Sequence, residues 1–222
     1  MPVRSILRRA KSMFEKDPNA VLKNVKGIIH VGANTGQEIG LYDQYGLGVV
    51  WIEPNPDIFE TLQSNLLGFP RQIAIKGLVS DLENVEYQFH IANNNGESSS
   101  ILELNLHQDI WPEIVYEKTI NLHSRTLPSL LKENNIDNRN YDMLVLDTQG
   151  SELLVLKGAT PILQDFNYIK AEVPDFESYK GCCQLKDLQL FLDQHGFREY
   201  ARHQFAKRRG GGSYYDIIYK KK

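Results

Sequence analysis

The sequence predicts a doubly wound α/β protein with a mostly parallel seven-stranded sheet that ends in an antiparallel hairpin. From residue 27 onward, short apolar runs alternate with helical patterns, which is typical of parallel strands covered by helices on both faces. Only a short glycine-rich segment separates the last two apolar runs, so these two strands must be antiparallel, because parallel strands need a long crossover. The length of 222 residues suits one large domain or one domain with additions.

The first part of the chain is expected to be a lead-in to the main domain. Basic residues interleave with apolar ones at helical spacing within residues 1–26, which indicates an amphipathic helix that packs on the domain edge or contacts an anionic membrane surface or a partner. The main domain then covers residues 27–222. Asn55 suits a helix N-cap and Pro56 the first helical position. In this half we expect strands over 27–31, 49–52 and 73–79, with helices over 35–45 and from 56 to about 67.

The middle of the chain breaks the alternation of strands and helices. Residues 85–92 and 118–123 alternate apolar and polar side chains, as half-exposed strands do, and they enclose a polar loop. We expect a hairpin-like insertion at about residues 83–125. The alternation then resumes, with helices over 127–134, 152–157 and 185–194 and strands over 143–146, 168–173, 198–205 and 214–219.

Composition excludes several classes of protein. The 25 Lys and Arg against 28 Asp and Glu give a net charge of −3, so a general nucleic-acid-binding surface is not expected. The two cysteines are adjacent, which excludes a disulfide scaffold and favours a reducing compartment. No apolar run is long enough to span a membrane, and no signal peptide is visible, so we expect a cytoplasmic protein. The histidines are scattered, so no metal site is expected.

Polar and glycine-rich residues follow several predicted strands. Ligands of open α/β sheets bind beyond the carboxyl ends of the strands. Gly32 and Gly36 frame the turn after the first strand, and Glu53 ends the second, where a carboxylate can accept hydrogen bonds from both ribose hydroxyls. Asp147 and Glu172 end two later strands. Together these residues predict a cofactor that contains a nucleoside.

The ordered set of these motifs resembles the FkbM-type S-adenosylmethionine-dependent methyltransferases. The resemblance extends over about residues 27–173 and implies a Rossmann-like methyltransferase fold, S-adenosylmethionine as cofactor and, most often, O-methylation of a sugar or polyketide hydroxyl. The motifs are HVGANTG from His30, EPNP from Glu53, DTQGSE from Asp147, LKGA from Leu156, and Glu172-Val173.

The resemblance also implies roles for individual residues. The turn after the first strand would line the methionine part of the cofactor, Glu53 would hold the ribose, and the residues after the third strand would lie near the adenine. The family commonly has Asp where this chain has His30, and Glu where it has Gln149. Glu38 either supplies a carboxylate for the cofactor's amino group or interacts only with the helix dipole. The expected cofactor-binding residues are His30, Gly32, Ala33, Asn34, Gly36, Glu53, Pro54, Ser80 and Asp81.

An alcohol acceptor must lose a proton during methyl transfer, which calls for a positioned general base. Asp147 and Glu172 are the candidates, although Asp147 could instead hold the following turn through the amides of Gly150 and Ser151. Gln149 lacks a negative charge, which argues against a metal or base role for it.

The acceptor is expected to be a small molecule, with Ser99 as one binding residue. Arg208 and Arg209 precede glycines in the final hairpin, and the pattern suggests that they bind an anionic acceptor. Two alternatives to a methyltransferase remain open. One is a nicotinamide-dependent oxidoreductase, and the other is a non-catalytic module that binds a glycan or a partner.

Overall fold

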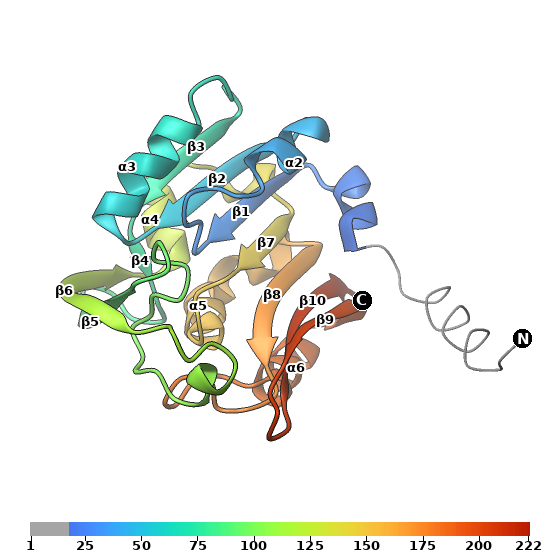
Figure 1. Ribbon diagram of the computed structural model, residues 1–222. Helices are drawn as coiled ribbons and strands as arrows, with labels where there is room; N and C mark the ends of the chain where they lie inside the picture. The colour runs from blue at the N-terminus through green and yellow to red at the C-terminus, as the bar shows by residue number, and fades with distance from the viewer. Residues whose placement is uncertain (1–17) are drawn as a thin grey trace, which may run out of the picture.

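The computed structural model describes residues 18–222 and contains the expected mostly parallel sheet (Figure 1). Its seven strands lie in the order β3-β2-β1-β7-β8-β10-β9. Strands β3, β2, β1, β7 and β8 pair in parallel, whereas β10 pairs antiparallel with both of its neighbours. The doubly wound sheet with a C-terminal antiparallel hairpin is therefore confirmed.

Most elements lie close to the expected positions. The main-sheet strands are β1 (Gly27–Val31), β2 (Gly48–Glu53), β3 (Gln72–Lys76), β7 (Met143–Leu146), β8 (Tyr168–Pro174), β9 (Phe197–Lys207) and β10 (Ser213–Lys221). The helices are α2 (Ile39–Gln44), α3 (Pro56–Asn65), α4 (Leu127–Glu133), α5 (Glu152–Gly158) and α6 (Leu185–Gln194), and the 3₁₀ segments are η1 (Pro18–Asn24), η2 (Leu106–Asp109), η3 (Asn138–Asn140) and η4 (Thr160–Asp165).

Two expected elements differ from the structure. The single strand expected over 73–79 is divided at Gly77 into β3 and β4 (Leu78–Val79), and β4 leaves the main sheet to pair with β6 (Tyr116–Arg125). The helix expected from residue 35 begins only at Ile39. Asn34 and Gly36 have φ angles of 44° and 78°, and residues in this left-handed region cannot continue a right-handed helix.

The expected insertion forms a small second sheet. Strands β5 (Glu86–Ala92) and β6 pair antiparallel, and β4 joins β6 to give the order β4-β6-β5. In Figure 1 this sheet and the segment that follows β5 lie beyond the carboxyl ends of β1 and β2. The insertion thus stands beside the edge where ligands of such sheets bind.

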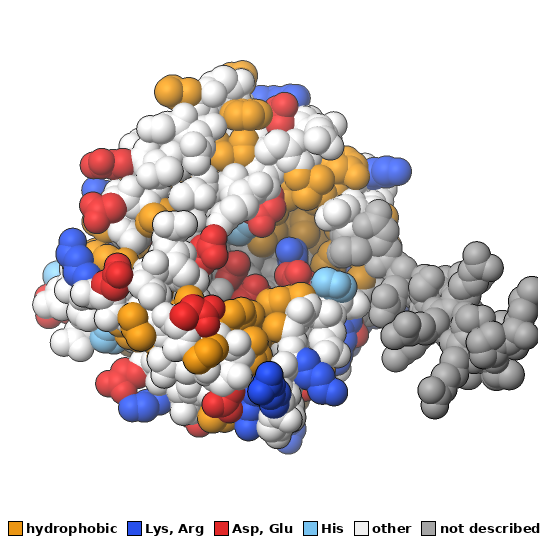
Figure 2. Space-filling view, in the orientation of Figure 1, with side chains coloured by type: hydrophobic (Ala, Val, Ile, Leu, Met, Phe, Trp, Pro, Cys, Tyr) orange, Lys and Arg blue, Asp and Glu red, His pale blue; other side chains and the backbone are white. Residues whose placement is uncertain are grey.

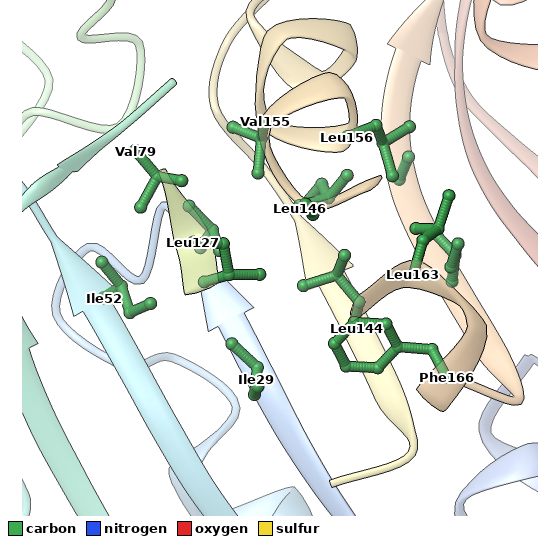
Figure 3. Close-up of a cluster of buried hydrophobic side chains, with 14 of the residues drawn as sticks. Ile29, Ile52, Val79, Leu127, Leu144, Leu146, Val155, Leu156, Leu163 and Phe166 are labelled. Carbon is green, nitrogen blue, oxygen red and sulfur yellow. The ribbon is translucent and has the colours of Figure 1, made fainter. Parts of the chain in front are cut away.

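The sheet buries an apolar core on each face. Ile29 and Ile52 point to one face, where they pack with Leu127, Val155 and Phe166 of the covering helical segments (Figure 3). Strand residues next to them in the sequence, such as Ile28, Val49 and Trp51, point to the opposite face, which η1, α2 and α3 cover. Burying each large aliphatic side chain contributes about 1.5–3 kcal/mol, so the two cores fix the strand ends that carry the polar residues.

The C-terminal hairpin reaches the carboxyl edge of the sheet, as the strand order requires. Because β10 is antiparallel to both β8 and β9, β9 runs in the same direction as β8 and delivers residues 208–212 to that edge. The basic helix expected near the N-terminus lies outside the described residues. Within residues 18–222, no helix has the length and apolar character needed to cross a membrane.

Candidate active site

A cavity of about 570 Å³ opens at the carboxyl edge, between the sheet and the insertion. Figure 2 shows this hollow near the centre of the molecule, with acidic side chains in and around it. The strands and the residues directly after them contribute His30, Gly32, Glu53, Pro54, Asp147, Gln149, Glu172 and Phe205. The segment between β1 and α2 contributes Ala33, Asn34, Gln37 and Glu38. The insertion contributes Phe89, Asn94, Gly96, Glu97, Ser98, Ser99, His107, Trp111, Glu113 and Ile114.

The backbone amides of the turn after β1 all donate hydrogen bonds within the protein. Gly32 N and Ala33 N both donate to the Ile52 carbonyl, Asn34 N donates to Glu53, and Gly36 N donates to the Ala33 carbonyl. The amide of residue 35 donates to the Asn34 side chain. A loop that cradles a pyrophosphate instead presents free backbone N–H groups at a helix start. This turn therefore lacks the donors of a dinucleotide site.

The two glycines of this turn are required by close packing. A Cβ on Gly32 would lie 1.8 Å from the Asp147 carbonyl oxygen, and its φ is +82°. This contact brings the ends of β1 and β7 together. Gly36 does not line the cavity, because its Cβ would point at the side chains of Ile39 and Leu62. Its expected cofactor contact stays a prediction, and the structure gives it a packing role.

Glu53 ties the turn after β1 to the start of α3. Its two carboxylate oxygens accept hydrogen bonds from Asn34 N and Asn55 N, each at 2.8 Å. Glu53 is buried, and burial raises its pKa to about 7 despite these two bonds. Each carboxylate oxygen keeps a second lone pair, so the residue can still accept ribose hydroxyls.

Gln149 joins the two candidate bases. Its side-chain Nε2 donates to Asp147 Oδ1 at 2.6 Å and to Glu172 Oε1 at 3.2 Å. Its Oε1 accepts the Tyr179 hydroxyl at 2.7 Å, and its carbonyl accepts Ser100 Oγ at 2.8 Å. The two carboxylates at the ends of β7 and β8 are thus linked through one amide, which is itself anchored to the insertion.

Burial is the main cause of the raised pKa values of both candidate bases, Asp147 and Glu172. It raises the pKa of Asp147 to about 7, although the Gln149 hydrogen bond acts in the opposite direction. Burial also raises the pKa of Glu172 well above its usual value, and the charge of Asp147 raises it further. A carboxylate with a pKa near 7 is a stronger proton acceptor than an ordinary aspartate and is still ionised in part at neutral pH.

The turn between β7 and α5 is held by Glu152. Its Oε1 accepts hydrogen bonds from Thr148 N at 2.9 Å, Thr148 Oγ1 at 3.1 Å and Gly150 N at 3.1 Å. Ser151 instead donates its hydroxyl to the Thr148 carbonyl. Of the two amides through which Asp147 could hold this turn, that of Gly150 donates to Glu152 instead, while Asp147 accepts the Gln149 side chain. Asp147 is left facing the cavity.

His30 and Glu38 line the cavity beside the turn after β1. The ring of His30 stacks on Trp51, with centroids 4.9 Å apart, and burial lowers its pKa to about 4. His30 is 4% exposed, and its Nδ1 has no hydrogen-bond partner in the structure. His30 is therefore neutral at pH 7, and the negative charge beside this turn comes from Glu38 rather than from position 30.

The insertion forms a largely aromatic wall opposite the strand ends. His107 contacts Ser98 Oγ through Nε2 at 3.3 Å and the Tyr214 hydroxyl through Nδ1 at 2.8 Å. Its ring lies 4.7 Å from that of Trp111, and burial lowers its pKa to about 4. The expected residue Ser99 lines the cavity, and its hydroxyl accepts a hydrogen bond from Ala92 N.

Sequence reasoning did not identify His107, Trp111 or Phe205. These residues carry no motif and reach the cavity only through the path of the insertion and the final hairpin.

Four other expected site residues lie away from the lining. Ser80 is fully buried and contacts the Tyr87 hydroxyl at 3.2 Å, and its hydroxyl donates to Asp81. Arg208 forms an ion pair with Asp109 at 2.9 Å. Arg209 is exposed at the hairpin tip. Their contacts with a cofactor or acceptor stay predictions, and none of these side chains lines the cavity.

The lining is strongly acidic. It contains six carboxylates and, among the described residues, no lysine or arginine. The two lining histidines are neutral, as their lowered pKa values require. Lys170 lies outside the lining and pairs with Asp216 at 3.1 Å. No group of three or more potential ligand residues in the described part of the chain is arranged to hold a metal ion. The cavity therefore favours cations over anions.

Comparison with known proteins gives both a family and a fold. The family model described as the methyltransferase FkbM domain matches residues 30–199. No curated protein matches the chain significantly.

Two solved structures share the fold. An uncharacterized protein from Listeria monocytogenes serotype 4b matches with a TM-score of 0.52 and 9% identity, over 93% of this chain and 68% of that one. Magnesium protoporphyrin IX methyltransferase from Synechocystis PCC 6803, solved with bound SAM, matches with a TM-score of 0.50 and 10% identity, over 97% and 79%.

Proposed function

The chain belongs to the FkbM methyltransferase family, and from this membership we propose that it methylates a hydroxyl of a sugar or a related small metabolite. S-adenosylmethionine is the cofactor of the family. The fold agrees with that of S-adenosylmethionine-dependent methyltransferases. The choice of an oxygen acceptor rests on the resemblance noted in the sequence and on the carboxylates at the strand ends.

The size and the acidic lining of the cavity support this cofactor. S-adenosylmethionine carries a sulfonium and an ammonium group, and six carboxylates line a space of about 570 Å³. Glu53 stands at the end of β2, where it would accept the ribose hydroxyls. Glu38 would hold the ammonium group, and the unpartnered His30 Nδ1 offers a further polar contact.

The same features argue against a nicotinamide dinucleotide. A pyrophosphate needs free backbone amides or cations, whereas the amides of residues 32–36 are all paired within the protein. The acidic lining would also repel the two phosphates. The oxidoreductase alternative thus lacks a phosphate site among the described residues.

In the proposed reaction, the cofactor supplies an electrophilic methyl group. The lining aligns the acceptor oxygen with that methyl group, because much of the catalysis in such a displacement is alignment. As the oxygen–methyl bond forms, the hydroxyl proton passes to the carboxylate of Asp147. Gln149 holds this carboxylate through its 2.6 Å hydrogen bond, and Glu172 shares the same amide. The products are a methyl ether, S-adenosylhomocysteine and one proton.

The observation that carries the proposal is the pair of strand-end carboxylates that face one cavity and share Gln149. The test is incubation with methyl-labelled S-adenosylmethionine and a metabolite extract, followed by identification of the labelled product. We expect a base-stable methyl ether. Methyl transfer to carbon, to nitrogen or to a carboxylate would contradict methylation of a hydroxyl. Cofactor binding without any transfer would favour the non-catalytic alternative.

A further inference from the structure

We propose that the acceptor carries a positive charge, as a protonated amine does, and that Glu97 and Glu113 recognise this charge at the rim of the cavity. The proposal rests on the proposed function, because it concerns the acceptor of the same methyl transfer. It replaces the anionic acceptor that the sequence suggested with the opposite charge.

The cavity has more carboxylates than the cofactor can use. S-adenosylmethionine has one net positive charge, since its carboxylate offsets one of its two cations. Glu38 and Glu53 are the acids placed beside the turn after β1, where the cofactor is expected. Two further pairs remain. Asp147 and Glu172 lie inside the cavity, where their raised pKa values reduce their negative charge at neutral pH, and Glu97 and Glu113 lie at its rim. A neutral sugar would need no such surplus, and an anion would be repelled by it.

The rim acids are free to bind a ligand. Glu97 and Glu113 are both exposed, and no ion pair or side-chain hydrogen bond engages either carboxylate within the described residues. The two segments lie side by side, because Asn93 Nδ2 donates to the Glu113 carbonyl at 2.9 Å and Asn93 N donates to the Val115 carbonyl at 3.1 Å. The insertion thus presents two uncompensated negative charges to the same opening.

Trp111 adds a second recognition element for a cation. Its half-buried indole lines the cavity two residues before Glu113, with His107 packed beside it. The face of an indole ring attracts ammonium groups, and it does so more strongly than other aromatic rings. An aromatic ring flanked by carboxylates is a common way to hold an amine.

The two arginines predicted to bind an anionic acceptor lie outside the cavity lining. Arg208 pairs with Asp109, and its guanidinium lies 5.4 Å from the centre of the Phe176 ring. Neither Arg208 nor Arg209 lines the cavity. The pair with Asp109 offsets the charge of Arg208, whereas Lys207 and Arg209 are exposed outside the lining.

The first test separates the methylated product by charge. The protein is incubated with methyl-labelled S-adenosylmethionine and a metabolite extract, and the products are passed over cation- and anion-exchange resins at neutral pH. Unreacted S-adenosylmethionine is itself a cation, so it is first separated from the products by chromatography against a standard; we expect the label of the remaining products on the cation exchanger. Label in the neutral or anionic fraction overturns the proposal, as does the absence of any labelled product. Binding of S-adenosylhomocysteine is measured on the same preparation. Loss of that binding, or binding with no labelled product at all, is a failure of the proposed function, whereas a labelled neutral or anionic product overturns only the charge of the acceptor.

The second test uses charge variants with a matched control. Glu97→Gln with Glu113→Gln removes both rim charges, whereas Glu86→Gln with Glu117→Gln removes two exposed charges of the second sheet outside the lining. With the cation-exchange fraction as acceptor, the rim variant should lose about three- to tenfold in kcat/KM, as expected for two exposed charge contacts. The control variant should keep the wild-type rate. Equal rates for all three proteins, or equal losses in both variants, would overturn the role of the rim acids.

Discussion

Gln149 donates hydrogen bonds to Asp147 and Glu172, two carboxylates that would otherwise repel each other. Two buried acids close together cannot both ionise readily, and each raises the pKa of the other. The amide of Gln149 donates one hydrogen bond to each, so it stabilises their ionised forms without adding charge. A glutamate at this position would place a third carboxylate in the same space. Gln149 therefore links the two acids by hydrogen bonds and adds no charge beside them.

Asp147 is predicted to act as the base, and its substitution separates catalysis from binding. Asp147→Asn should lower turnover by about 10²–10⁴-fold, the usual contribution of a general base. Wild-type turnover should rise as the pH increases through about 7, because burial raises the pKa of Asp147 to that value and only the ionised form accepts a proton. The variant should lack this pH dependence. Calorimetry should give nearly unchanged affinity for S-adenosylhomocysteine, and a large loss of affinity at unchanged turnover would make Glu172 the base.

Gln149 is predicted to set the pH at which that base works. Gln149→Glu adds a negative charge beside Asp147, which should raise the pKa of Asp147 and move the rise in turnover to higher pH. The measurement is kcat against pH for the wild type and the variant. Gln88→Glu adds the same charge on an exposed position of β5 and should leave the profile in place. A midpoint that stays constant or falls in Gln149→Glu would contradict this positioning role.

At the level of single residues, the sequence predicted positions better than contacts. Glu53, Asp147 and Glu172 were recognised because they end strands, and strand ends of a parallel sheet meet at one edge. The ion pair of Arg208 with Asp109 was not predicted, because it joins segments far apart in the chain, which no local pattern reveals.

Among the elements, the turn between β7 and α5 shapes the site most directly. It contains Gln149 and Gly150, whose φ angles of 51° and 102° lie in the left-handed region. Such a conformation costs free energy for a residue with a side chain, so it needs support from its surroundings. Glu152 supplies that support by accepting the turn's amides from the first turn of α5.

Loss of this support should destabilise the whole protein. Glu152→Ala leaves Thr148 N and Gly150 N without their acceptor, and each buried unpaired donor costs about 1–3 kcal/mol. We expect the free energy of unfolding in urea to fall by about that amount or more. Glu60→Ala, at an exposed position of α3, should change it by less than about 0.5 kcal/mol. If both variants unfold at the same urea concentration as the wild type, Glu152 does not hold the turn.

Elements with strong local signals were predicted well. Strand β7 and helix α6 have the expected limits, because a fully apolar run and a clear amphipathic pattern define them. Asn55 caps α3 through its side chain as expected, accepting from Asp57 N at 3.1 Å. The division of the third strand at Gly77 was missed, because its apolar pattern continues across the glycine while the hydrogen-bonding partner changes from β2 to β6.

For the whole molecule, strand order and charge together define what the cavity can bind. The order β3-β2-β1-β7-β8-β10-β9 brings the ends of β1, β2, β7 and β8 to one opening, and the insertion closes its far side. The sequence showed the alternation and the final hairpin, but it did not show that the lining excludes lysine and arginine among the described residues. The net charge of the chain is only −3, yet six of its 28 acidic residues line this opening.

The central claim is that this opening binds an adenosyl cofactor, and calorimetric titration with S-adenosylhomocysteine and with NAD tests it most directly. The account predicts one S-adenosylhomocysteine per chain, no detectable binding of NAD, and a loss of about 1–3 kcal/mol in binding free energy for Glu53→Gln, which removes a ribose acceptor. Glu60→Gln should bind like the wild type. Binding of NAD without binding of S-adenosylhomocysteine would contradict the account.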